Sequence, residues 1–150
     1  MKLTPSKING FLAFKLPSAY LMGVRVKSIS EVECRTTVRY RWINSNPFHS
    51  MFWAVQGMAA ELSTGALVMS QIKSSEKNVS MLVASNKATF HKKAQGRITF
   101  TCKDGKLVEE VVKDAIKSGE GKTLWMKSDG IDTNGILVSE FEFEWTLKRR

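Results

Sequence analysis

The sequence predicts an α+β fold: one long buried helix wrapped by a curled antiparallel sheet of about five strands, with short accessory helices. The first observation is the segment Met51–Met69, which is apolar along most of its length and is expected to be covered on nearly all sides. The second is that most of the remaining chain alternates apolar and polar residues, as strands with one buried face do. The third is the length of 150 residues, which suits one domain, with residues 1–22 as an N-terminal helical extension.

The first predicted element is a short helix that opens at Thr4-Pro5, an N-cap residue followed by proline at the first helical position. We expect it to stop near Pro17. One side of this helix carries apolar residues at a spacing of four: Ile8, Leu12 and Leu16.

A strand is predicted over Cys34–Trp42, where buried-type residues alternate with arginines and threonine. The pair Asn46-Pro47 repeats the cap-then-proline pattern, so the central helix is expected to begin there and to end at about Gln71 or Lys73.

The second half of the chain predicts four strands and one further helix. The strands are Val79–His91, Arg97–Lys103, Lys122–Ser128 and Ile136–Leu147. The helix is Lys106–Lys117, whose apolar residues recur at the spacing of an amphipathic helix. All these elements have one apolar side, and a curled sheet around a central helix would bury every such side.

Composition limits the classes of function. The net charge of +9 favours anionic partners, yet basic residues are spread over the whole length, no nucleic-acid recognition motif is present, and we expect no nucleic-acid partner. Glu61 interrupts the apolar segment, which argues against a membrane span. Cys34 and Cys102 lack metal-ligand spacing and are read as buried reduced thiols of a cytoplasmic protein; we expect no metal.

The central segment resembles the active-site segment of PaaI-like acyl-CoA thioesterases. In that family an Asn precedes a His-Gly-Gly motif by six residues, and an acidic residue follows the second Gly by seven. Here Asn46 stands in the place of the Asn, Ser50 in that of a small hydroxyl residue, and Glu61 in that of the acid. One departure is that Phe52-Trp53-Ala54 replaces His-Gly-Gly, which crowds the backbone's approach to a thioester.

Two other segments extend the resemblance over most of the chain, from Gly23 to the end. Phe90–Arg97 resembles the strand-ending segment of the same family, an aromatic residue followed by a basic-Pro-Ala-x-Gly pattern. The N-terminal helix and Gly23–Val26 resemble a thioesterase-related family of unassigned function. The resemblance implies the hotdog fold, a homodimer that could pair into a tetramer, and an acyl-CoA substrate with no cofactor beyond the coenzyme A that the substrate carries.

Each candidate catalytic residue also has a structural reading. Glu61 is either the general base or nucleophile that opens a thioester, or a carboxylate bonded to a neighbouring strand or chain. Asn46 is first a helix cap, and the resemblance implies that the helix start it caps polarises the thioester carbonyl. Ser50 could touch the substrate, but no spacing of a catalytic triad supports it as a nucleophile.

The candidate substrate-binding residues fall into two groups. Around the helix they are His49, Phe52, Trp53, Ala54 and Thr64. His49 also fits an ordinary surface histidine, and Thr64 a hydroxyl bonded back to the helix backbone. Beyond the helix they are Lys92, Lys93 and Arg97, which form either an ordinary basic turn or a clamp for the phosphates of coenzyme A.

Two functions therefore stay open from the sequence. The first is an acyl-CoA thioesterase that releases a free acid and coenzyme A. The second is a hotdog protein without catalytic activity that binds an acyl chain or acyl-CoA. The replacement of the glycines by Trp53 and Ala54 is what makes the second function a serious alternative.

Overall fold

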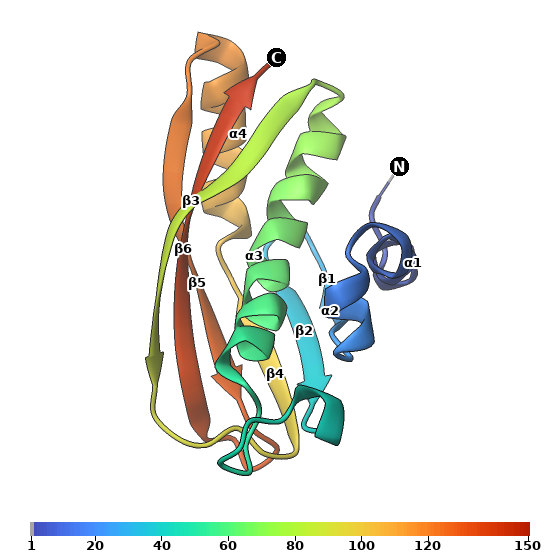
Figure 1. Cartoon of the computed structure of the whole chain (residues 1–150). Coiled ribbons are helices and arrows are strands. Elements are labelled where there is room, and N and C mark those ends of the chain that lie inside the picture. The colour runs from blue at the N-terminus through green and yellow to red at the C-terminus, as the bar shows by residue number, and fades with distance from the viewer. Residues whose placement is uncertain (1) are drawn as a thin grey trace.

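The computed structural model describes residues 2–150. A single six-stranded antiparallel sheet curls around one long helix, α3, and two short helices cover the remaining side (Figure 1). The helices are α1 (Pro5–Lys15), α2 (Pro17–Leu21), the 3-10 helix η1 (Trp42–Asn44), α3 (Trp53–Ser75) and α4 (Gly105–Ser118). The strands are β1 (Arg25–Ile29), β2 (Cys34–Arg39), β3 (Val79–Phe90), β4 (Arg97–Cys102), β5 (Lys122–Ile131) and β6 (Leu137–Arg149).

The predicted fold class is confirmed, with one strand more than expected. The strand order is β1-β2-β4-β5-β6-β3, so β3 lies at one edge of the sheet and β1 at the other. The core forms between α3 and the inward rows of the strands. In β6 this row includes Phe141, Phe143, Trp145 and Leu147, as the alternation predicted.

The strand β1 was not predicted from the sequence. It is short, carries a bulge between Val26 and Ser28, and buries only Val26. Its outer edge is covered by a side chain of α1. The amide of Asn9 donates a hydrogen bond to the carbonyl of Val26 (3.1 Å) and accepts one from its N–H (2.8 Å). Asn9 thus satisfies backbone groups that would otherwise be open to pairing with another strand.

The N-terminal helix begins as predicted, since the Thr4 hydroxyl accepts a hydrogen bond from the N–H of Lys7. Ile8 and Leu12 are buried, but Leu16 is exposed, because the helix ends at Lys15 and α2 starts at Pro17. The two helices lie on the same flank of the molecule, beside α3 and β1 (Figure 1).

Two predicted boundaries are wrong at the junction between β2 and α3. The strand ends at Arg39, and Trp42 lies in η1. The reason is that the Asn44 side chain accepts a hydrogen bond from the N–H of Arg41 and donates one to the carbonyl of Arg39. The central helix begins at Trp53 rather than at Asn46-Pro47, and it ends at Ser75, slightly beyond the predicted end.

Candidate active site

A short loop before α3 is organised by Asn46, which is not a helix cap. Its Oδ1 accepts hydrogen bonds from the N–H groups of Phe48 (2.9 Å) and Ser50 (3.2 Å), and its own N–H donates to the carbonyl of Ser50 (2.8 Å). The Ser50 hydroxyl lies 3.0 Å from Asn46 Nδ2 and 3.2 Å from Oδ1. His49 has a positive φ of 62°, which closes the loop. Asn favours turns in which its side chain bonds to the backbone. The pair Asn46-Pro47 therefore fits such a turn as well as the helix cap that the sequence predicted.

The start of α3 presents unused donors next to this loop. Phe52 is the N-cap residue and supplies no side-chain cap; its carbonyl accepts the N–H of Val55. Within residues 2–150 the structure records no acceptor for the N–H groups of Trp53 and Ala54. These groups carry the positive end of the helix dipole, so they are suited to bind an oxygen with partial negative charge.

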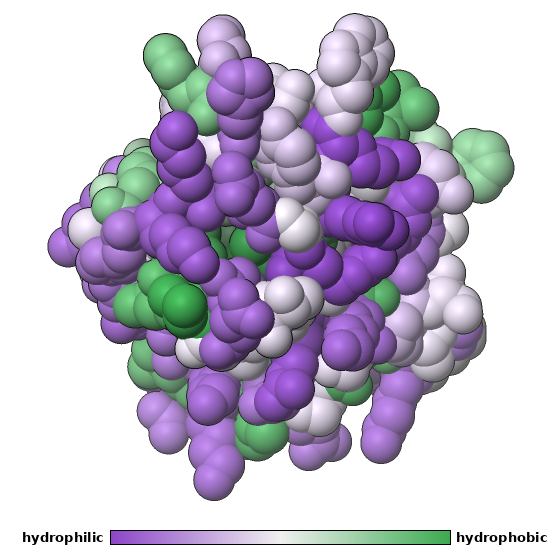
Figure 2. All heavy atoms as spheres, turned by 90° about the horizontal axis from the view of Figure 1, so that it is seen from below, coloured by the Kyte–Doolittle hydropathy of each residue, from purple (hydrophilic) through white to green (hydrophobic). Residues whose placement is uncertain are grey.

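A depression of about 340 Å³ opens between this loop, the first turn of α3 and the segment that follows β3. Its lining is Asn46, Ser50, Met51, Trp53, Gln56, Phe90, His91, Lys92, Lys93 and Ala94. It lies at the lower end of the molecule in Figure 1, and Figure 2 shows this end: hydrophilic residues surround a hollow with apolar residues at its floor. The structure thus brings together Asn46, Ser50, Trp53 and two of the three predicted basic residues.

Hydrogen bonds tie the segment after β3 to the loop. The Lys93 ammonium donates to the carbonyl of Phe48 (3.0 Å), and the Gln95 side chain donates to the carbonyl of His49 (2.7 Å). Met51 donates its N–H to the carbonyl of Ala94 (2.9 Å). These contacts position the loop before α3.

The three predicted basic residues are not one cluster. Lys92 forms an ion pair with Asp132 (2.9 Å), which holds the pKa of that carboxyl below its ordinary value. Arg97 begins β4 directly opposite Arg39 of β2, on the outer face of the sheet, and its guanidinium lies 3.4 Å from the Thr37 hydroxyl. Only Lys93 combines a place in the depression with no ion pair among the described residues.

Glu61 lies on a half-exposed stripe of α3, outside the depression. Starting from Trp53, it is about 12 Å further along the helix axis. Neither carboxylate oxygen has a hydrogen-bond or ion-pair partner in the part of the chain that the structure describes. Burial without a compensating partner raises the pKa of Glu61 above its ordinary value of 4.5. A carboxyl group in this state binds a proton more readily than an exposed one, as a general base requires.

Thr64, three residues after Glu61, lies on the neighbouring side of α3 and is fully buried. Its hydroxyl donates to the carbonyl of Glu61 (2.8 Å) and accepts from the indole N–H of Trp145 (2.9 Å). The hydroxyl of Ser63 likewise donates back to the helix, at Ala60. The reading of Thr64 as a hydroxyl bonded to the backbone therefore agrees with the structure, which gives it no open surface for a substrate.

Sequence reasoning missed part of the lining of the depression, notably Gln56 and Phe90. Gln56 is one of few polar residues in an apolar segment and lies one turn after Trp53, a spacing that would have indicated a shared face. Its Oε1 accepts a hydrogen bond from the buried Ser139 hydroxyl (2.7 Å). Phe90 packs edge-on against Phe141 (5.6 Å between ring centroids) and forms the wall on the β3 side.

Both cysteines are free thiols buried in neighbouring strands, and burial raises the pKa of Cys34 to about 12 and that of Cys102 further still. In the described residues no three side chains of His, Cys, Asp or Glu gather as metal ligands would. None of the described helices is long and apolar enough to cross a membrane.

Residues 6–147 match the model of a family described as a domain of unknown function, DUF4442. The chain belongs to this family. The matched region of this DUF4442 protein includes nearly all of α1 as well as α2, so the N-terminal helices fall within the family domain. Among curated proteins, none matches the chain.

Solved structures resemble this DUF4442 protein over its full length. A Pseudomonas aeruginosa protein of unknown function, described as a probable thioesterase, is 20% identical, with a TM-score of 0.84 and 100% and 99% of the two chains covered. A Chlorobaculum tepidum protein of unknown function is 15% identical, with a TM-score of 0.83 and 99% of each chain covered. A Haemophilus influenzae thioesterase is 13% identical, with a TM-score of 0.74 and 99% and 93% covered. At these identities the likeness shows the fold, which is the hotdog fold.

Proposed function

We propose that this protein is an acyl-CoA thioesterase that hydrolyses a thioester to a free acid and coenzyme A. The observation that carries the proposal is Glu61: a half-buried carboxyl group with a raised pKa, left without a partner on a helix whose fully buried polar side chains are all hydrogen-bonded. Carboxyl groups whose pKa is shifted by their surroundings are frequent general bases. The hotdog fold and thioesterases among its structural relatives support the same reaction class.

In the proposed reaction the thioester carbonyl lies against the free N–H groups of Trp53 and Ala54, which stabilise the negative charge that develops on its oxygen. Glu61 accepts a proton from water as the water oxygen attacks the carbonyl carbon. The C–S bond then breaks, and the proton moves to the departing thiolate of coenzyme A. No cofactor is needed beyond the coenzyme A of the substrate.

The reaction requires Glu61 and the start of α3 to meet, and within one protomer they are about 12 Å apart along the helix. We therefore propose that the site forms in a homodimer. On β3, every residue from Ala84 to Phe90 is exposed, and the strand pairs only with β6. An open edge of this kind invites pairing with a second β3. Two-fold pairing makes the two α3 helices antiparallel, so the start of one approaches the middle of the other.

Subunit mixing tests this shared site. Glu61→Gln and Asn46→Ala are each expected to be inactive, the second because it removes the acceptor that holds the loop before α3. If each site combines the two residues from different protomers, mixed dimers contain one intact site, and activity returns to about a quarter of the wild-type value on random exchange. If both residues act within one protomer, mixtures stay inactive. Sedimentation and circular dichroism check that both variants fold and dimerise.

A second function, binding of acyl-CoA without turnover, is favoured by one observation. Phe52 and Trp53 stand where the resembling family has a His and a Gly, both are largely exposed, and Trp53 lines the depression. Hydrolysis measured over a panel of acyl-CoA chain lengths, beside calorimetric binding of the same compounds, separates the two functions. Turnover of any acyl-CoA that is abolished by Glu61→Gln supports the thioesterase; tight binding with no turnover supports the alternative.

Basic residues near the depression are candidates for the phosphates of coenzyme A. Lys93 is the strongest candidate, while Lys92 is held by Asp132 and Arg97 lies on the outer face beside Arg39. Lys93→Ala is expected to raise KM severalfold, since phosphate contacts bind ground and transition states alike, whereas loss of its contact with the Phe48 carbonyl would lower kcat. The effect on KM should vanish with an acyl-pantetheine, which lacks the nucleotide. An unchanged KM would exclude Lys93 from this role.

The reduced thiols support a cytoplasmic location.

A further inference from the structure

The N-terminal segment has an unusual charge distribution. No acidic residue occurs before Glu31, whereas basic residues recur throughout the segment. They are Lys2, Lys7, Lys15, Arg25 and Lys27. This segment forms α1, α2 and most of β1, so these elements contribute basic residues and no acidic residue to their flank of the molecule.

The same flank exposes large apolar side chains. On α1, Lys7, Phe11 and Phe14 fall at positions i, i+4 and i+7 and so share one face, and the Phe14 side chain is 85% exposed. Leu16 and Leu21, at the two ends of α2, are exposed as well. Isolated exposed apolar residues are ordinary, but a contiguous group of them marks an interaction surface.

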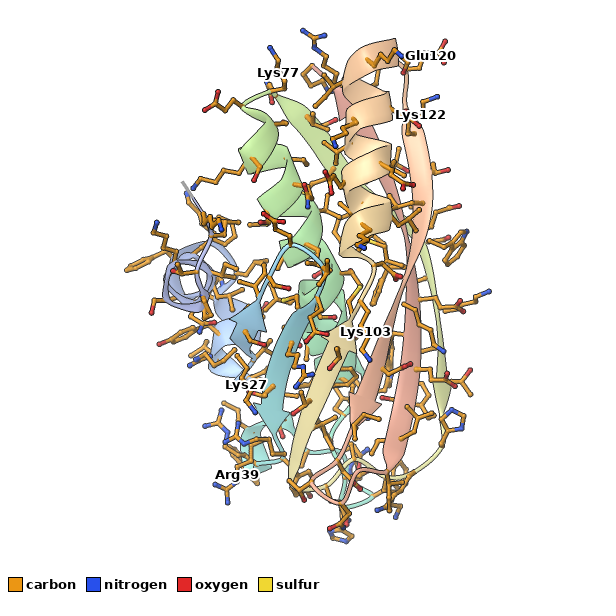
Figure 3. The ribbon with its side chains drawn as sticks, turned by 180° about the vertical axis from the view of Figure 1, so that it is seen from behind. Lys27, Arg39, Lys77, Lys103, Glu120 and Lys122 are labelled. Carbon is orange, nitrogen blue, oxygen red and sulfur yellow. The ribbon has the colours of Figure 1, made fainter. Side chains whose placement is uncertain are left out.

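The 3-10 helix η1 extends this surface. Trp42 is 89% exposed, which is rare for tryptophan, and Ile43 beside it is also exposed. Arg41 donates to the carbonyl of Leu21 (3.3 Å) and Asn44 to that of Met22 (3.1 Å), which joins η1 to the end of α2. Figure 1 shows α1, α2 and η1 along one flank, and Figure 3 shows the same flank from behind, with nitrogen-tipped side chains around Arg39 near its lower end.

We call this surface the N-terminal patch. It comprises the apolar residues Phe11, Phe14, Leu16, Leu21, Trp42 and Ile43 and the cations Lys7, Lys15 and Arg41. None of its three cations forms an ion pair with a carboxylate of residues 2–150. The patch is also fixed by the fold: Ile8 and Leu12 anchor α1 in the core, and Asn9 binds both backbone groups of Val26. The apolar side chains are therefore held outward on a rigid element.

We propose that the N-terminal patch docks on an anionic membrane surface, with α1 in the interface plane and Phe14 and Trp42 inserted among the lipid headgroups. Phenylalanine, leucine and tryptophan beside lysines on a short helix are typical of interfacial helices. Tryptophan prefers the headgroup level, and each nearby cation adds attraction to anionic lipid. A contact of the patch with itself across a two-fold axis would oppose cations to cations, which disfavours a second copy as occupant.

Flotation with vesicles tests the proposal without any assay of catalysis. The intact chain is mixed with vesicles of phosphatidylcholine alone and of phosphatidylcholine with phosphatidylglycerol. Binding is expected only with phosphatidylglycerol, and it should weaken as salt rises because the charge interactions are screened. The double variant Phe14→Ser/Trp42→Ser should bind about tenfold more weakly or worse. Lys7→Glu/Lys15→Glu should lose at least about tenfold.

Matched controls come from α4, which lies on a different flank (Figure 3). Leu107→Ser removes an exposed apolar side chain, and Lys106→Glu/Lys117→Glu makes the same change of charge as the α1 pair. Both controls should bind vesicles like the wild type. Equal losses in controls and patch variants would overturn the proposal, because general charge or solubility would then explain binding.

The depth of Trp42 gives an independent readout. On vesicle binding, lipids brominated in the acyl chain should quench tryptophan fluorescence, and Trp42→Phe should remove the quenching while most of the binding remains. The proposal is overturned if the wild type does not bind anionic vesicles at low salt. It is also overturned if Phe14→Ser/Trp42→Ser only abolishes self-association in sedimentation, since the patch would then cover a second copy of the chain.

Discussion

Polar side chains on the two faces of α3 differ in whether they have a hydrogen-bond partner. On the covered face the polar side chains are paired across the core: Ser63 with Ser128 (2.7 Å), Gln56 with Ser139 (2.7 Å) and Thr64 with the Trp145 indole (2.9 Å). On the open face Glu61, the one ionisable residue between Trp53 and Ile72, has no partner in the described residues.

The presence or absence of a hydrogen-bond partner distinguishes structural from functional polar residues on α3 more clearly than residue type does. Buried polar groups are expensive unless hydrogen-bonded, so pairs on the covered face are what a stable core requires. An unpaired carboxylate on the open face weakens the isolated protomer, and its retention needs another reason. Glu140, on the outer face of the sheet, shows the usual solution: Lys127 and His91 bind its carboxylate and hold its pKa below the ordinary value.

The largest expected effect follows from removing the base on the open face. Glu61→Gln keeps the shape and loses the proton acceptor, so kcat for the best acyl-CoA of the panel should fall at least about 100-fold. The change should leave the dimer and the circular dichroism spectrum intact. Glu142→Gln, which alters an exposed carboxylate paired with Lys87, is the control and should keep full activity. Wild-type rates in Glu61→Gln would move the chemistry to another residue.

The next effect concerns the covered face and should appear in stability alone. Thr64→Val keeps the volume but leaves the indole N–H of Trp145 buried without an acceptor, which should lower the free energy of unfolding by about 1–3 kcal/mol. KM and kcat of the folded variant should be unchanged. Urea unfolding and steady-state kinetics check both points, and a raised KM at unchanged stability would instead return Thr64 to the substrate site.

A pH dependence should distinguish the two faces further. Because the folded-state pKa of Glu61 is raised, its contribution favours folding below the ordinary value of 4.5 and is lost as pH rises through the raised value. Glu61→Gln should therefore be more stable than the wild type at pH 7 and lose this advantage toward pH 4. The advantage amounts to about 1.4 kcal/mol for every tenfold by which folding raises the proton affinity of the carboxylate. Thermal unfolding of both proteins across this range measures it. An identical pH profile would mean that the carboxyl group is fully solvated.

The smallest effect compares two glycines of α3. A Cβ at Gly57 would contact Phe141 at an ordinary 3.6 Å, whereas one at Gly65 would lie 3.2 Å from the Trp145 ring. Alanine favours the helix by about 1 kcal/mol at either position. Gly57→Ala should keep most of that gain and Gly65→Ala should lose it to crowding, so their unfolding free energies should differ by about 1 kcal/mol. Equal stabilities would show that Trp145 moves aside freely.

The sequence predicted the fold because nearly every element of this protein has one apolar face. The alternation in β6 and the apolar length of α3 each specify a period and a buried side, and together they leave few arrangements. Boundaries were less predictable where one residue has two local uses. Asn46 fits a cap and a turn equally well, and only tertiary contacts such as Lys93 with Phe48 select the turn.

The candidate site was predicted in part for a related reason. Glu61 stands out in one dimension, because a charge within an apolar run is visible in the sequence. Whether side chains form one cluster depends on the three-dimensional fold. Lys92 and Arg97 are close in the chain, yet Lys92 pairs with Asp132 and Arg97 lies on the outer face of the sheet. Alternation along β4 turns Arg97 outward, and the partner of Lys92 lies in the β5–β6 turn, which no local pattern links to it.

The pair of hydrogen bonds between Asn9 and Val26 has a consequence for assembly. A sheet with two open edges can add strands at both ends and grow without limit, as in fibrils. Here the Asn9 amide occupies backbone groups at the β1 edge, while β3 remains open at the other. The β1 edge is therefore less open to strand pairing than the β3 edge. In the proposed homodimer, two copies joined at β3 would use up the more open edge, which disfavours further growth through strand pairing.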